Sequence, residues 1–186
     1  MKKILLSMIA VGCAASAFGQ GIVNFENALG TGYVTIGGPY NGLNAAAPGT
    51  YDVALLWFNG SSFQQIGAVY HTSTANGDGA GYFFGETVTV PTYASTGTFE
   101  VQGWTGNYAS YAAAVAGSAI PGQTASFISA EGNLSATPPG LAAPLAPPDP
   151  GAGNWDGSLI LVVPEPSTIA LGALGAAAFW LFRRRK

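Results

Sequence analysis

The segment YDVALLWFNGSSFQQIGAVYH, Tyr51–His71, decides the fold. Over residues 51–58, side chains at odd and at even positions are both apolar, although an extended chain sends them to opposite faces. These side chains are Val53, Leu55 and Trp57 on one face and Ala54, Leu56 and Phe58 on the other. Two apolar faces predict a strand in the middle of a sheet. Asn59 and Gly60 then predict a tight hairpin onto residues 62–71.

Further runs rich in Val, Thr and aromatic residues follow the same pattern, with Gly and Asn between them. This composition favours strands. The predicted strands are residues 21–26, 32–36, 51–58, 62–71, 81–90, 97–104 and 158–163. Residues 123–130 fit either a strand or a loop. The expected fold is therefore mainly β, a single β-sandwich, for which a jelly roll or barrel would give a similar pattern.

Two segments depart from the strand pattern. Tyr108, Tyr111 and Val115 fall at helical spacing, and Gly117 fits a C-cap, which predicts one short helix ending there. Residues 134–153 contain six prolines, which cannot donate backbone hydrogen bonds, so this stretch predicts a long extended loop.

The charges are divided unevenly along the chain. All six Lys and Arg residues lie at the two ends, and residues 20–163 contain none. Eight of the nine acidic residues lie in residues 20–163, whereas the ninth is Glu165. Without a cation to contact phosphate, this region is not expected to bind nucleic acid. Cys13 is the only cysteine, so no intrachain disulfide is possible.

Residues 1–19 have the pattern of a secretory signal peptide. A basic start and a short apolar run precede small residues, with cleavage expected after Ala17 or Gly19. Signal peptidase is then an expected partner. A lipoprotein signal at Cys13 and an uncleaved N-terminal anchor are the alternatives.

The other end of the chain has three parts in order, VPEPSTIALGALGAAAFWLFRRRK over residues 163–186. The apolar run 168–182 would span about 22 Å as a helix, against a hydrocarbon core of roughly 30 Å. The long flanking cations can cover the difference by snorkelling, so a transmembrane helix is predicted. The flanking cations, Arg183, Arg184, Arg185 and Lys186, are expected to stay cytoplasmic.

This order of parts resembles the PEP-CTERM sorting signal of Gram-negative bacteria, and Pro164, Glu165 and Pro166 match the motif residue for residue. The resemblance implies an exosortase as a partner that cuts near these residues. It also implies an exported protein that is held at the inner membrane and then released to the outer surface or the extracellular matrix, often alongside exopolysaccharide. The implied organisation is a signal peptide (1–19), an outer domain (20–163) and the sorting signal (164–186).

Groups that could perform chemistry are sparse. His71 is the only histidine, which excludes multi-histidine zinc sites, and no Gly-x-Ser-x-Gly turn supports a Ser-His-Asp triad. Residues 74–79 resemble a calcium loop, but Thr74 stands at the first position and Gly85 at the twelfth, which favours a glycine-rich turn. No catalytic residue, metal or cofactor is expected.

Three functions remain open for residues 20–163. Paired carboxylates such as Glu86 and Glu100 would indicate a surface glycoside hydrolase. Trp104 and Trp155, expected to be exposed, could stack on sugar rings and would indicate a carbohydrate-binding module, whereas Trp57 is expected in the core. The favoured hypothesis is an envelope or matrix protein without enzymatic activity.

Overall fold

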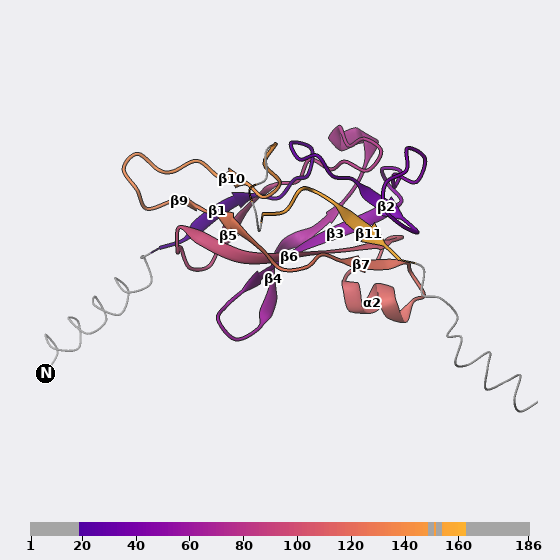
Figure 1. Cartoon of the computed structure of the whole chain (residues 1–186). Coiled ribbons are helices and arrows are strands. Elements are labelled where there is room, and N and C mark those ends of the chain that lie inside the picture. The colour runs from indigo at the N-terminus through magenta and orange to yellow at the C-terminus, as the bar shows by residue number, and fades with distance from the viewer. Residues whose placement is uncertain (1–18, 149–150, 152–153, 163–186) are drawn as a thin grey trace, which may run out of the picture.

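The computed structural model describes residues 19–148, 151 and 154–162. These residues form a mainly β structure with three sheets and one short α-helix (Figure 1). The predicted β-rich domain is therefore confirmed at the level of fold class. The predicted signal peptide, up to residue 18, and the predicted segment 164–186 lie outside the described residues. Among the described residues, no helix has the length and apolar character needed to cross a membrane.

The largest sheet is built around the segment that the sequence marks as central. Its strands are β4 (Phe63–His71), β3 (Tyr51–Phe58), β6 (Thr96–Thr105) and β7 (Pro121–Gln123), in that order, with β8 (Phe127–Ala130) also paired to β6. Strand β3 is antiparallel to both neighbours, and its residues 51–56 are buried. The predicted hairpin is confirmed: the Asn59 side chain accepts hydrogen bonds from the Ser61 and Ser62 amides at 2.9 Å, and Gly60 has a φ of 93°.

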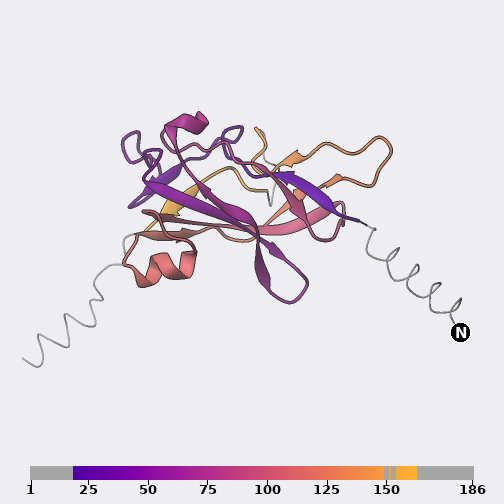
Figure 2. The same cartoon turned by 180° about the vertical axis from the view of Figure 1, so that it is seen from behind.

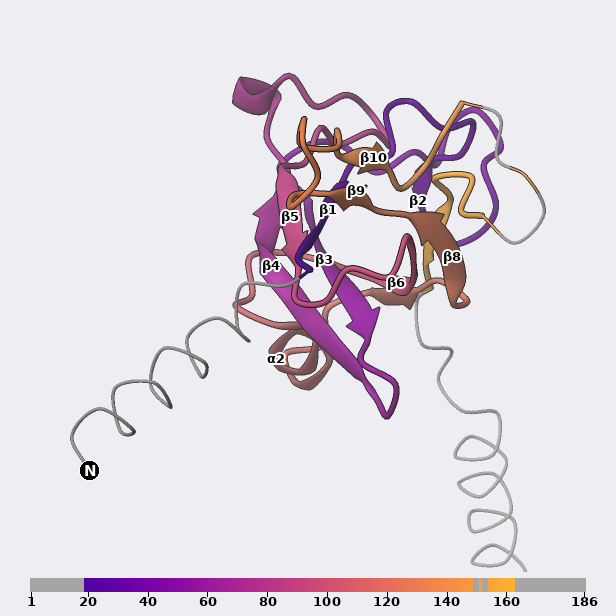
Figure 3. The same ribbon diagram turned by 90° about the vertical axis from the view of Figure 1, so that its left-hand side faces the viewer.

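Two smaller sheets complete the β structure. One contains β1 (Gly21–Asn24), β5 (Thr87–Val90), β9 (Gly132–Asn133) and β10 (Ala143–Pro144). The other pairs β2 (Val34–Ile36) in parallel with β11 (Leu159–Leu161). Viewed along the molecule, the strands surround a common interior (Figure 3). Segments far apart in the sequence therefore meet: β2 lies early in the sequence and β11 last.

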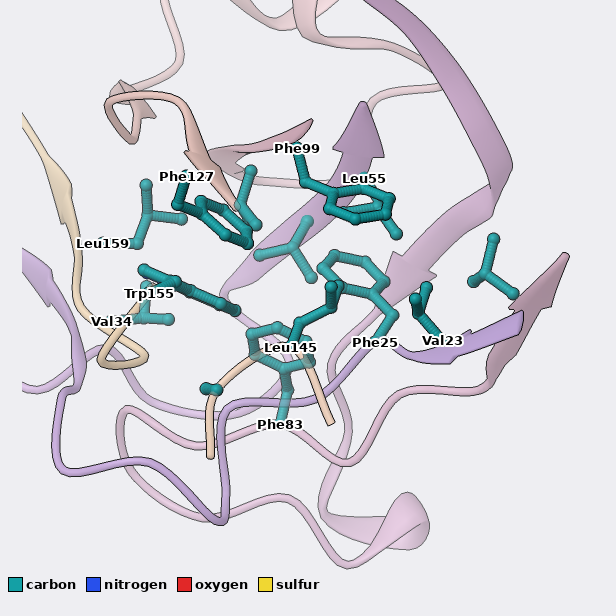
Figure 4. Close-up of a cluster of buried hydrophobic side chains, with 14 of the residues drawn as sticks. Val23, Phe25, Val34, Leu55, Phe83, Phe99, Phe127, Leu145, Trp155 and Leu159 are labelled. Carbon is teal, nitrogen blue, oxygen red and sulfur yellow. The ribbon is translucent and has the colours of Figure 1, made fainter. Parts of the chain in front are cut away.

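The main core collects side chains from all three sheets and from the loops between them (Figure 4). The odd-numbered face of β3 contributes Val53 and Leu55, as the alternation predicts. Other members are Val23, Phe25, Val34, Phe83, Phe99, Phe127, Leu145, Trp155 and Leu159. Each such apolar side chain contributes about 1.5–3 kcal/mol when fully buried. The sequence allows no disulfide, and among the described residues the one salt-bridge contact is that of His71 with Asp52. Burial of these apolar side chains is therefore the main source of stability.

A smaller cluster lies on the opposite face of the five-stranded sheet. Helix α2 (Tyr111–Ala116) lies beside this sheet (Figure 2), and its Ala114 belongs to the same buried cluster as Ala54 and Trp104. Its N-cap is Ser110, whose side chain accepts a hydrogen bond from the Ala113 amide at 3.2 Å, and its C-cap is Gly117. The predicted helix and its end are thus confirmed, and from the even-numbered face of β3 Ala54 packs in the cluster that this helix shares.

A buried amide joins the loops around the core. Asn27, fully buried, donates to the carbonyl oxygens of Gly81 at 2.9 Å and Gly157 at 3.1 Å, and accepts from the Phe83 amide at 2.7 Å. These bonds satisfy backbone groups that would otherwise pair in a strand. This explains why β5 begins at Thr87, and not at residue 81 as predicted.

The structure also shows the conformation of residues 123–130 and of the described part of the proline-rich residues 134–153. Residues 123–130 contribute to two strands, β7 and β8, because the Thr124 hydroxyl accepts from the Val101 amide at 3.0 Å between them. The described part of residues 134–153 is a loop, as predicted, with β10 as its one short strand.

Candidate functional site

The last described strand, β11, is hydrogen-bonded to the rest of the domain. Strand β11 pairs with β2, and the Gly37 amide donates to the Leu161 carbonyl at 2.8 Å. On the other side, the Val162 amide donates to the Pro121 carbonyl at 2.9 Å. Hydrogen bonds therefore hold the chain up to Val162, directly before the Val-Pro-Glu-Pro sequence.

A family model described as the PEP-CTERM protein-sorting motif matches residues 162–186. The chain carries a PEP-CTERM sorting motif. The predicted recognition is thereby confirmed, and the PEP-CTERM match includes Pro164, Glu165, Pro166 and the cluster Arg183–Lys186. It marks an exported, membrane-associated protein that an exosortase sorts. The individual roles of these residues, which lie outside the described part, stay predictions.

Two further comparisons give no relative. No curated protein matches the chain, and no solved structure matches it. The function of the β domain must therefore be argued from its own side chains.

Both tryptophans predicted to stack on sugars are buried, so their expected exposure was wrong. Trp104 is 0% exposed, because α2 covers it and Tyr111 packs edge-on against its ring at 6.1 Å. Trp155 is 5% exposed and stacks on Phe127 at 5.5 Å, with its indole N–H donating to the Ser158 carbonyl at 2.8 Å. Neither ring offers a free face to a ligand.

The imidazole of His71 contacts a buried carboxyl group. Its Nδ1 lies 3.0 Å from Oδ1 of Asp52 on strand β3. Burial raises the pKa of Asp52, and the neighbouring His71 opposes that rise. An oriented imidazole of this kind could act as a base, but among the described residues no hydroxyl is hydrogen-bonded to its ring. The described part of the chain therefore supplies the Asp–His half of a triad and no nucleophile beside it.

The predicted glycine-rich turn fits what Asp78 does in the structure. Its carboxylate accepts hydrogen bonds from the Ser73 amide at 2.7 Å, the Phe84 amide at 2.8 Å and the Tyr70 hydroxyl at 3.1 Å. The carboxylate thus points into the protein and fixes the loop that contains Gly77. Within the described residues, no cluster of three metal-ligating side chains is found.

The structure does not bring the two candidate glycosidase carboxylates together. Glu86 lines a cavity of about 490 Å³ between β4 and β5, beside Tyr70 and Asn76. Glu100 lies on β6, where it accepts from the Gln123 side chain at 2.7 Å, and it does not line that cavity.

Three tyrosines form a surface cluster that sequence reasoning missed. The rings of Tyr33 and Tyr40 are stacked, with centroids 4.1 Å apart and planes at 12°. Tyr82 packs against Tyr33 at 4.6 Å, and the adjacent Tyr33 hydroxyl together with burial raises the pKa of Tyr82 to about 12. Residue spacing could not reveal the cluster, because its members come from separate segments. The only local signal is Tyr40 itself, an aromatic residue within the turn-rich sequence GGPYNG.

Glu131 is a third buried carboxyl group, after Asp52 and Asp78. Its Oε2 accepts from the Ala94 amide at 3.2 Å, whereas its Oε1 has no partner among the described residues. The carboxyl group occupies the space that side chains at Gly21 and Gly97 would fill. Burial raises the pKa of Glu131.

Proposed function

We propose that this chain is an exosortase-sorted protein of the cell surface or extracellular matrix that has no enzymatic activity. The observation that carries the proposal is the PEP-CTERM motif at residues 162–186. It follows directly on a β domain whose last residues are hydrogen-bonded to that domain. The domain is then cargo, and the motif determines where it is delivered.

The proposed maturation has two cleavages. Signal peptidase removes the N-terminal segment after Ala17 or Gly19, and the helix 168–182 holds the protein at the inner membrane with Arg183–Lys186 in the cytoplasm. The exosortase then cuts near Pro164–Pro166 and releases the domain. Two prolines restrict this peptide to extended conformations without amide donors, which leaves Glu165 as its one charged recognition element.

The absence of enzymatic activity is supported by where the candidate groups lie. Glu86 and Glu100 do not share a cavity, and Asp78 is engaged by backbone amides. The His71–Asp52 pair has no nucleophile beside it among the described residues. We further propose that the domain is a β-sandwich, which is supported by the contribution of all three sheets to one core.

The sorting step is tested by replacing the motif's carboxylate. Glu165→Ala removes the charge that the exosortase is proposed to read, so the protein should accumulate in the membrane fraction and be lost from the released fraction. Glu86→Ala, which removes an exposed carboxylate of the domain, is the matched control and should leave release unchanged.

Mass spectrometry of the released protein gives the second measurement. The wild-type protein should end near Pro164–Pro166. A released form that still contains Arg183–Lys186, or normal release of Glu165→Ala, would contradict the proposal.

A further inference from the structure

We propose that Tyr33, Tyr40 and Tyr82, here called the tyrosine platform, bind a neutral glycan by stacking against the apolar face of a sugar ring. This inference deepens the proposed function by naming a ligand class, and it rests on that function for the compartment in which the glycan would be met. It moves the predicted sugar-stacking role from the buried tryptophans to an exposed aromatic surface.

The tyrosine platform depends on a close approach of the backbone at Val34 to the backbone at Gly81. The Val34 amide donates to the Gly81 carbonyl at 2.9 Å, which brings the residue before Tyr82 against Tyr33. Gly81 has a φ of +75°, and a Cβ at this position would lie 3.0 Å from the Tyr33 ring. Glycine at this position therefore allows Tyr33 and Tyr82 to pack.

The outer ring is held by the loop that carries it. The Asn44 side chain donates to the Gly38 and Pro39 carbonyls, both at 2.9 Å, and accepts from the Asn41 amide at 3.0 Å. Tyr40 lies within this braced loop and stacks on Tyr33, while 49% of Tyr40 remains exposed. A binding surface that is fixed before the ligand arrives loses less entropy on binding.

The geometry of the rings favours a sugar over a small cation. An aromatic box for a quaternary ammonium group surrounds an open space with ring faces. Here the rings pack on one another at 4.1 and 4.6 Å, so no such space lies between them. Neither described cavity is lined by these tyrosines. The platform therefore does not enclose a ligand, and its exposed ring is Tyr40, stacked over Tyr33, which fits one unit of a polymer better than an enclosed small ligand.

The negative net charge of the domain favours neutral glycans over anionic ones. Residues 20–163 contain no Lys or Arg and eight acidic residues. An anionic glycan would find no Lys or Arg as an ion-pair partner and would be repelled by the net negative charge of residues 20–163. Tyrosine combines an apolar ring with a hydroxyl that can bond to sugar hydroxyls, so a neutral glycan matches both features.

The experiment uses the full-length protein in mild detergent and titrates it calorimetrically with neutral hexasaccharides of glucose and of mannose. Saturable binding to at least one of them is expected. Tyr40→Ala should weaken it roughly two- to tenfold, the range of one aromatic contact. Tyr40→Trp should retain it, because the flat face is kept. Phe84→Ala is the matched control, since Phe84 is 47% exposed and lies outside the platform, and it should bind like the wild type.

Several outcomes would overturn the proposal. They are a lack of saturable binding to every neutral probe, wild-type affinity of Tyr40→Ala, and binding of only polyuronate or tetramethylammonium. Thermal melting of Tyr40→Ala checks that this variant is folded. If it is not folded, glycan binding by Tyr40→Trp provides the test instead.

The tests of the platform and of sorting fail separately. Tyr40→Ala should be exported and released normally, whereas Glu165→Ala should keep glycan affinity. If the glycan-binding test fails while sorting behaves as expected, only the tyrosine platform is overturned. If the sorting test fails while glycan binding behaves as expected, only the proposed function is overturned.

Discussion

Glu131 is the residue whose ionisation should be visible in the stability of the domain. Its carboxyl group is buried, Oε1 has no partner among the described residues, and burial raises its pKa above the ordinary value. The folded state then holds a proton that the unfolded state has already lost between the ordinary and the raised pKa. The free energy of unfolding contributed by Glu131 is therefore full below the ordinary pKa, about 4.5, and is lost as the pH rises through the folded pKa.

The substitution Glu131→Gln tests whether the free energy of unfolding falls with rising pH because of Glu131. The uncharged amide cannot ionise, so the stability of the wild type relative to the variant should fall between pH 4 and pH 7. Urea unfolding of the released protein at both pH values measures the difference. Glu86→Gln, an exposed carboxylate, is the control and should leave the pH dependence of the wild type unchanged. A constant difference between wild type and Glu131→Gln would show that the pKa of Glu131 is not raised by folding.

At the scale of elements, the cap of α2 determines how the smaller cluster is covered. The Ser110 side chain satisfies an amide of the first turn, and the helix then buries Trp104. Ser110→Ala should cost about 1 kcal/mol of stability and weaken the near-ultraviolet circular dichroism of that indole. Ser126→Ala removes the same hydroxyl from an exposed position outside the helix, so this control should stay within about 0.5 kcal/mol of the wild type. Equal effects of the two substitutions would mean that the cap does not hold the helix.

Elements with local signals were predictable, whereas contacts between distant segments were not. Strand β3 and its turn follow from apolar alternation and Asn59-Gly60, and the sorting motif is contiguous in sequence. Trp104 was misjudged because it shares a face with Glu100 and Gln102, and only the packing of α2 separates it from them. The tyrosine platform depends on the approach of Gly81 to Tyr33, which no local pattern encodes.

At the scale of the whole molecule, the domain combines a shared core with charge of nearly one sign. Strand β1, the first along the chain, and strand β11, the last, lie toward opposite sides of the body in Figure 1. Eight acidic residues lie in residues 20–163 without a Lys or Arg, and in the described residues His71 forms the one observed salt-bridge contact. Core burial must therefore offset a mutual repulsion of carboxylates that most small domains neutralise with surface cations.

This repulsion predicts an unusual response to salt. Raising NaCl shortens the Debye length from about 30 Å at 0.01 M to about 8 Å at 0.15 M, which screens like charges across the folded surface. The melting temperature of the released protein at pH 7 should therefore rise over this range, because the compact state carries the carboxylates closer together than the unfolded chain does. The same titration at pH 3, where most carboxylates are protonated, is the internal control and should show a much smaller rise. A melting temperature that falls with salt at pH 7 would mean that attraction, and not repulsion, dominates the surface charges of this domain.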